Sequence, residues 1–291
     1  MGSRGYISMA RANSVNYLLG TKFHKMAYVE FGNPAAPPVL CVHGLTRNGR
    51  DFDTLAEALS DQFHVICPDL PGRGKSDWLA ESMAYQPASY VVALAHLLAV
   101  IGKPVAWVGT SLGGICGMML AAAQNAPITR LVLNDVGPHI PAAALKRIRD
   151  YMADAPERFA SLAALEAHLR LIHASFGHLS NAQWAQLARH SWRQALNQTG
   201  AGAFAMHYDP KIVEPMRAAV PLDVDMWPLW EQIKTPILAI RGAQSDLLLA
   251  DTFAQMQTGG AQPFEVPDAG HAPALMDSAA IAKIRDFLNQ G

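Results

Sequence analysis

Cysteine and charge are both scarce in this sequence. Three Cys occur in 291 residues, an odd number and too few for a disulfide framework, and all three lie in apolar runs typical of buried side chains. Charged residues make up 16% and the net charge is −1, so no basic surface is available for nucleic acid or an anionic membrane. We therefore expect no nucleic-acid partner, no membrane partner and a reducing, cytoplasmic location.

Long hydrophobic runs, metal motifs and nucleotide motifs are also missing. The most apolar stretch, 104–123, is interrupted by glycine and polar residues between Gly109 and Gly114, which makes it a poor membrane span. His168 and His173 lack the four-residue spacing of a helical zinc pair, and no dinucleotide fingerprint follows an early strand. The sequence therefore predicts no metal and no cofactor.

Hydrophobic residues make up 51% of the chain, enough for a large core. A hairpin is predicted over 14–31, and after it short apolar runs alternate with helical patterns. The strands are predicted at 39–42, 64–67, 105–108 and 131–133, and the helices at 51–59, 87–101 and 112–124. This alternation is typical of a mostly parallel sheet covered by helices on both faces, an α/β fold.

The alternation stops after Pro138 and resumes with a strand at 236–240. Only helical patterns and loops are expected in between. We predict a core domain formed by 1–136 and 232–291, interrupted by a helical cap at 137–231.

The strongest local motif is Gly-Thr-Ser-Leu-Gly at 109–113. An apolar strand runs into it and a helix of small residues runs out, which is the context of a nucleophile elbow. The flanking glycines permit a sharp turn, and the helix N-terminus then points at the hydroxyl. Ser111 is the predicted nucleophile.

A serine nucleophile needs a base and a carboxylate to orient that base. His271 follows the last predicted strand, and Asp246 follows the strand at 236–240. Both lie at carboxyl ends of strands, the same edge of the sheet as Ser111. Asp246 is the predicted acid, and Asp135, which ends the strand before the cap, is its rival.

Acyl transfer also needs donors for the developing oxyanion. The backbone N–H of Leu112, directly after the nucleophile, is one candidate. Gly44 would let the backbone bend so that the N–H of Leu45 supplies the other, with His43 fixing this loop.

Together, His43-Gly44, 69–76, 109–113, Asp246 and Gly270-His271 resemble the alpha/beta-hydrolase superfamily, over nearly the whole chain. The chain is similar to its capped group of esterases, enol-lactonases and meta-cleavage-product hydrolases. The resemblance implies an eight-stranded, mostly parallel sheet with the cap between strands 6 and 7. Ser111 stands where the dehalogenase and epoxide-hydrolase branches carry Asp. Carbon–carbon hydrolases often place Trp where Ala272 stands, which weakens that interpretation.

The resulting hypothesis is a serine hydrolase of a small carboxylic ester, lactone or thioester, working as a monomer or homodimer on a small-molecule substrate. The alternatives are a carbon–carbon hydrolase of the meta-cleavage-product type, with Arg189 or Arg193 binding a second carboxylate, and a ligand receptor with little turnover. Acyl transfer to an alcohol is also open. Aromatic and histidine side chains are predicted to line a substrate pocket under the cap. They are His43, His139, Trp184, Trp192, His207 and Trp227.

Overall fold

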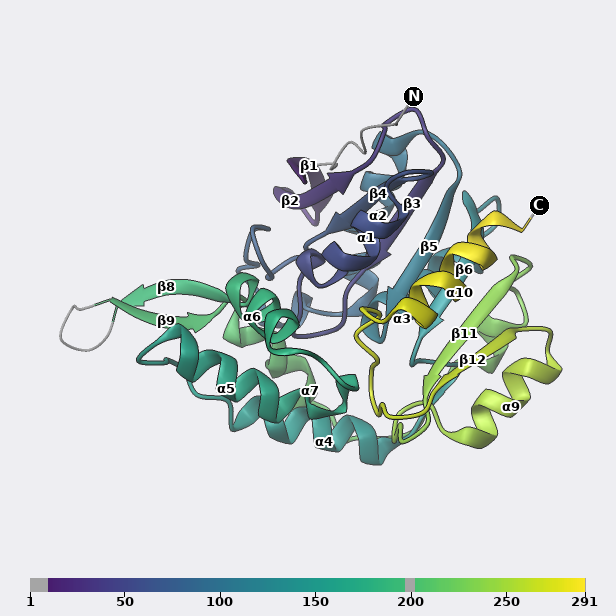
Figure 1. The fold of residues 1–291 in the computed structure, drawn as a ribbon. Coiled ribbons are helices and arrows are strands. Elements are labelled where there is room, and N and C mark those ends of the chain that lie inside the picture. Colours follow the sequence, from purple (N-terminus) through teal and green to yellow (C-terminus); the bar gives the residue numbers. More distant parts are fainter. Residues whose placement is uncertain (1–9, 197–201, 291) are drawn as a thin grey trace, which may run out of the picture.

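The structure is a computed structural model that describes residues 10–196 and 202–290. An eight-stranded sheet runs through it in the order β1-β2-β4-β3-β5-β6-β11-β12 (Figure 1). β1 and β2 are antiparallel to their neighbours, and all pairs from β4 to β12 are parallel. The strands are β1 Arg11–Leu19, β2 Lys22–Phe31, β3 Pro38–Val42, β4 His64–Pro68, β5 Val105–Thr110, β6 Ile128–Asn134, β11 Ile237–Gly242 and β12 Gln262–Val266. The mostly parallel α/β sheet predicted from the sequence is confirmed.

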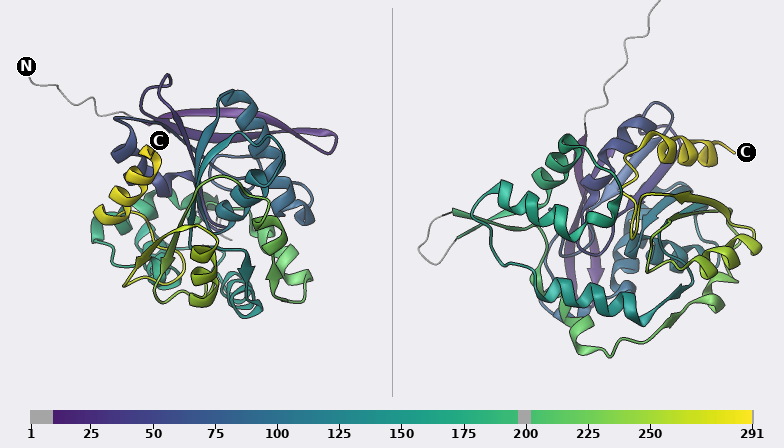
Figure 2. Two further views of the ribbon diagram at one scale, coloured as in Figure 1. Left: turned by 90° about the vertical axis from the view of Figure 1, so that its right-hand side faces the viewer. Right: turned by 60° about the horizontal axis from the view of Figure 1, so that its bottom comes forward.

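Helices cover both faces of the sheet (Figure 2). One face packs on α1 Asp53–Leu59 and α10 Ser278–Asn289, with Leu55, Ile284 and Phe287 in the shared core. The other face packs on α2 Pro87–Ile101, α3 Leu112–Ala121 and α9 Ala250–Thr258. Strands β3 and β11 are buried along their whole length, which is why their sequences read as continuous apolar runs.

The chain between β6 and β11 forms five helices within the described residues, α4 to α8. They are α4 Ala142–Ala153, α5 Leu162–Ile172, α6 Asn181–His190, α7 Glu214–Ala218 and α8 Trp227–Trp230. Short 3-10 turns complete the fold at η1 Gly49–Phe52, η2 Ser82–Ala84, η3 Ala174–Phe176 and η4 Pro210–Val213. We retain 137–231 as the proposed cap.

The expectation of helices and loops alone in this region is wrong. β7 His139–Ile140 pairs with β10 Val224–Asp225, and β8 Trp192–Leu196 pairs with β9 Gly202–Met206. The first pair joins two-residue strands that lie more than eighty residues apart, so no local pattern could reveal it. The β8 and β9 strands are only five residues each, too short for alternation to be distinguished from a helical pattern.

The inserted segment lies over the carboxyl edge of the parallel strands. Asn48, just after β3, donates its side-chain amide to the His190 carbonyl at 2.8 Å. The N–H of Gly270, after β12, donates to the Ser175 carbonyl at 2.8 Å. The loops that follow the strands are therefore enclosed between the sheet and the inserted helices.

Candidate active site

Ser111 stands at the turn between β5 and α3. Its φ of 50° and ψ of −113° are strained for a residue with a side chain. The turn is tight because a Cβ on Gly113 would meet the Val42 carbonyl oxygen and one on Gly109 would meet the Gly113 backbone. The N–H of Ser111 donates to the Asn134 carbonyl at 3.0 Å. These contacts fix the serine at the carboxyl edge of the sheet.

His271 lies in the loop that follows β12, and its ring contacts the serine. Its Nε2 is 3.0 Å from Ser111 Oγ, within the range for proton transfer from the hydroxyl. Its backbone carbonyl accepts a hydrogen bond from the Ser175 hydroxyl of the inserted segment. The ring is therefore held between the sheet edge and the helices above it.

The carboxylate beside His271 belongs to Asp135, the residue after β6. Its Oδ2 lies 2.7 Å from His271 Nδ1 and accepts from the Ser245 hydroxyl at 2.6 Å. Its Oδ1 accepts from the Gly242 N–H at 2.8 Å. The side chain is fully buried. Three fixed contacts make Asp135 a rigid partner that orients the imidazole.

The prediction that Asp246 contacts His271 is wrong. Asp246 forms a bidentate ion pair with Arg147 on α4, at 2.5 and 2.8 Å, and half of its side chain is exposed. The two aspartates follow neighbouring parallel strands, β6 and β11, so chain order and strand position favoured both equally. Ser245, the residue before Asp246, contacts Asp135 instead.

Two backbone N–H groups remain free beside the serine. Neither the N–H of Leu45 nor that of Leu112 has an acceptor among the described residues. Gly44 lies against the serine, since a Cβ on it would be 3.7 Å from Ser111 Cβ. Both N–H groups belong to residues that line the same cavity as Ser111, the arrangement that an oxyanion needs.

His43 fixes this loop from within the core. Its Nε2 accepts from the Leu70 N–H at 2.9 Å, and its Nδ1 lies 2.7 Å from the Gly44 carbonyl. Burial lowers the pKa of His43 to about 3, so the ring is neutral and Nδ1 donates. His43 is buried and does not line the cavity beside Ser111, so the prediction that it contacts substrate is wrong.

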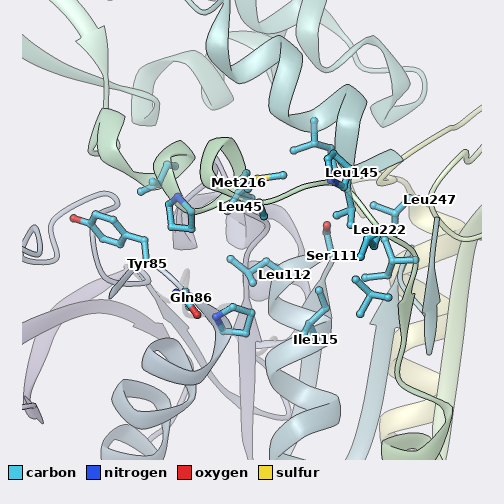
Figure 3. A pocket seen from close by; sticks show the side chains of 18 of the residues that line it. Leu45, Tyr85, Gln86, Ser111, Leu112, Ile115, Leu145, Met216, Leu222 and Leu247 are labelled. Carbon is cyan, nitrogen blue, oxygen red and sulfur yellow. The ribbon is translucent and has the colours of Figure 1, made fainter. Parts of the chain in front are cut away.

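A cavity of about 690 Å³ opens beside the Ser111 hydroxyl (Figure 3). Its floor comes from Leu112, Ile115 and Val136, and its roof from α4 and from residues 212–224. The lining is mainly aliphatic, and Asp223 is its one charged side chain among the described residues. The cavity therefore favours neutral, apolar groups.

The other predicted substrate contacts lie outside this lining. Trp184 is buried beside Arg170, His207 accepts from the Gly74 N–H, and Trp192 packs on Phe204. Trp227 packs edge-on against Trp230. Trp184 and Trp230 are buried in packing, the commoner fate of large apolar residues, whereas Trp192 is partly exposed at 37%.

His139 also lies outside the lining, although its Nε2 is 3.4 Å from Asp223 Oδ2. Sequence reasoning missed several residues that line the cavity, among them Tyr85, Tyr90, Leu145 and Leu222. They are aliphatic or aromatic residues of ordinary helices and loops, and no sequence signal distinguishes them from core residues.

The described residues hold neither a metal cluster nor a membrane-spanning helix. No three His, Cys, Asp or Glu side chains gather there as a metal site requires. Within 10–196 and 202–290, no helix has the length and apolar character to cross a bilayer.

The fold and this site define a hydrolase of the alpha/beta type, in which a nucleophile elbow, a histidine and a buried carboxylate meet at the sheet edge. The chain belongs to the alpha/beta hydrolase family, whose model matches residues 39–284. A 3-hydroxybutyrate-oligomer hydrolase from Cupriavidus necator is 43% identical over 91% of this chain and 92% of its own length.

Solved structures agree with this assignment. A crystal structure described as a putative hydrolase from Rickettsia typhi has a TM-score of 0.87 and 33% identity, covering 97% of this chain and 99% of that chain. An alpha/beta hydrolase from Novosphingobium aromaticivorans has a TM-score of 0.84 and 36% identity with the same coverage.

Proposed function

We propose that this protein is a serine hydrolase of neutral carboxylic esters, with Ser111 as nucleophile, His271 as base and Asp135 as the orienting acid. The observation that carries the proposal is the unbroken line of contacts from Ser111 Oγ through His271 to Asp135 Oδ2, at 3.0 and 2.7 Å. Asp135 replaces Asp246, our first choice from the sequence.

The reaction follows from this geometry. His271 Nε2 takes the hydroxyl proton as Ser111 Oγ attacks the ester carbonyl, and Asp135 stabilises the imidazolium that forms. The N–H groups of Leu45 and Leu112 bind the oxyanion. His271 then protonates the leaving alcohol, and a water that His271 activates releases the acid from the acyl-enzyme.

The cavity argues against the carbon–carbon hydrolase alternative. A substrate with a second carboxylate would need a cation, and no Arg, Lys or His lies in the lining formed by the described residues. Arg189 and Arg193, the candidates from the sequence, are not part of that lining either. A neutral ester needs no such cation.

Short oligoesters of 3-hydroxybutyrate, with the terminal carboxylate capped as a methyl ester so that the chain is neutral, are the first substrates to test. The relative that is 43% identical over most of both chains is named for hydrolysis of such oligomers. An aliphatic cavity of about 690 Å³ has room for more than one four-carbon repeat, since pockets of this size hold drug-sized ligands.

We expect Ser111→Ala to lower turnover of p-nitrophenyl butyrate and of a 3-hydroxybutyrate trimer methyl ester by at least about 10³-fold, because the nucleophile is lost while binding remains. Steady-state kinetics beside circular dichroism checks this. Near-normal turnover by a folded variant would overturn the nucleophile assignment. Saturable binding of the trimer by wild type without product release would favour the receptor alternative.

A further inference from the structure

The wall of the cavity continues onto the molecular surface as an apolar strip. We call residues 218–224 the strap; it runs from the last residue of α7 to the first residue of β10, and six of its seven residues are uncharged and apolar. All seven line the cavity. Met83 of η2, which packs near α7, lines it as well.

The exposed part of this lining is unusually apolar. Val220 is 78% exposed, Leu222 70% and Met83 50%. Among the described residues, twelve large apolar side chains are exposed. Four of them line this one cavity, namely Met83, Val220, Leu222 and Val224. Exposed apolar side chains gathered in this way mark a binding surface, whereas scattered ones do not.

The strap carries one charge, on Asp223. Its Oδ1 accepts from the Ala142 N–H at 2.7 Å, and its Oδ2 lies 3.4 Å from His139 Nε2. The hydrogen bond from the Ala142 N–H has the larger effect and the His139 contact the smaller, and both lower the pKa of Asp223. The carboxylate is therefore anionic at neutral pH. Across the cavity, the described lining offers no cation to balance it, so a negatively charged ligand is repelled.

We propose that the strap and Met83 bind the outer part of a neutral aliphatic ester chain that is longer than the cavity, and that Asp223 rejects chains ending in a carboxylate. This assignment rests on the proposed function. A short substrate would leave Val220, Leu222 and Met83 in water, whereas an extended chain would cover them and continue the apolar lining outward.

A single chain fits this surface better than a folded partner does. Four partly exposed side chains present on the order of a few hundred Å², whereas a stable protein interface covers about 800 Å² on each partner. One extended aliphatic chain needs no larger area than the strap supplies.

The test compares Val220→Ser/Leu222→Ser with Val100→Ser/Leu171→Ser. The control residues are 62% and 76% exposed and lie on α2 and α5, away from the cavity lining. Two substrate series are used: p-nitrophenyl esters from acetate to dodecanoate, and butyrate esters of alcohols from methanol to decanol. The second series is needed because either side of the ester can occupy the cavity.

For wild type and control, kcat/KM should rise about two- to fourfold per added methylene in at least one series, once the chain exceeds the cavity. The strap variant should lose this rise, whatever its turnover of the shortest ester. A wild type that shows no rise in either series, or a strap variant as steep as the control, would overturn the proposal.

Asp223→Asn tests the charge filter, because the amide oxygen can still accept from the Ala142 N–H. Esters with a terminal carboxylate should gain about three- to tenfold in kcat/KM relative to neutral esters of equal length, and added salt should shrink this gain. If the ratio of kcat/KM for carboxylate-terminated esters to kcat/KM for neutral esters does not change, Asp223 does not repel such substrates. A change in oligomeric state of the strap variant, seen by light scattering, would instead assign the strap to a second copy of the chain.

These outcomes are separable from failure of the proposed function. If wild type turns over no ester of either series, including the shortest, or if Ser111→Ala turns over the shortest ester as fast as wild type, the proposed function fails. If short esters are cleaved and the chain-length rise is absent, only the further inference fails.

Discussion

At the scale of single residues, the choice between two aspartates decides how the histidine works. Asp135 is fully buried with three fixed contacts, whereas Asp246 is half exposed and paired with Arg147. Only a carboxylate held by the interior can keep the imidazole in one orientation during the reaction. The exposed pair contributes at most about 1 kcal/mol to folding.

We therefore expect Asp135→Asn to lower kcat by about 10²- to 10⁴-fold, because the amide no longer stabilises the imidazolium and favours the wrong tautomer. Asp246→Asn, which is the same chemical change on a neighbouring loop, should change kcat less than about threefold. Kinetics on p-nitrophenyl butyrate compares the two. The larger loss at Asp246 would restore the assignment that the sequence first suggested.

At the scale of secondary structure, the site depends on how closely α3 approaches β3. The elbow between β5 and α3 brings Gly113 against the backbone carbonyl of Val42. A backbone atom cannot rotate away as a side chain does, so the helix would have to move. Glycine at 113 therefore fixes both the helix position and the direction of the Leu112 N–H.

Gly113→Ala should destabilise the fold by about 3 kcal/mol, since the new methyl group overlaps this backbone. Gly44→Ala is the matched control, because its Cβ would find only ordinary contacts at 3.7 Å and beyond. Urea denaturation followed by fluorescence measures both free energies of unfolding. Equal stabilities would mean that the elbow has room that the structure does not show.

At the scale of the whole molecule, buried histidines link stability to pH. Burial lowers the pKa of His43 to about 3 and lowers the pKa values of His173 and His207 well below 6.5. Each ring is neutral in the folded chain and binds a proton on unfolding at acidic pH. Burial raises the pKa of Asp69 to about 6, which opposes the histidines between about pH 4 and 6.

The unfolded chain thus holds more protons than the folded chain between about pH 4 and 6.5, and the free energy of unfolding should rise with pH across this window. The unfolded chain binds about two more protons than the folded chain, because Asp69 offsets one of the three histidines. The free energy of unfolding therefore rises by roughly 2–3 kcal/mol per pH unit. Guanidinium denaturation at pH 5, 5.5 and 6 measures it. His207→Gln should reduce the slope, and a flat or falling profile would contradict the burial of these rings as neutral groups.

The sequence by itself determined the elements of the sheet, the elbow at Ser111 and the positions of His271, Leu45 and Leu112 at the edge of the sheet. Each of these depends on local patterns: an apolar strand, glycines at a sharp turn, and a short loop after a strand. The carboxyl ends of parallel strands share one edge, so the meeting of these groups followed from topology alone.

Only the tertiary structure decided which aspartate reaches His271, which side chains line the cavity and where β7 pairs with β10. Asp135 and Asp246 end neighbouring strands, and the direction of each side chain depends on packing between distant segments. Arg147, 99 residues away in sequence, draws Asp246 toward α4, while Ser245 and Gly242 hold Asp135 inward. Contacts across such separations leave no periodic trace, because the pattern along a chain records only which face of each element is buried.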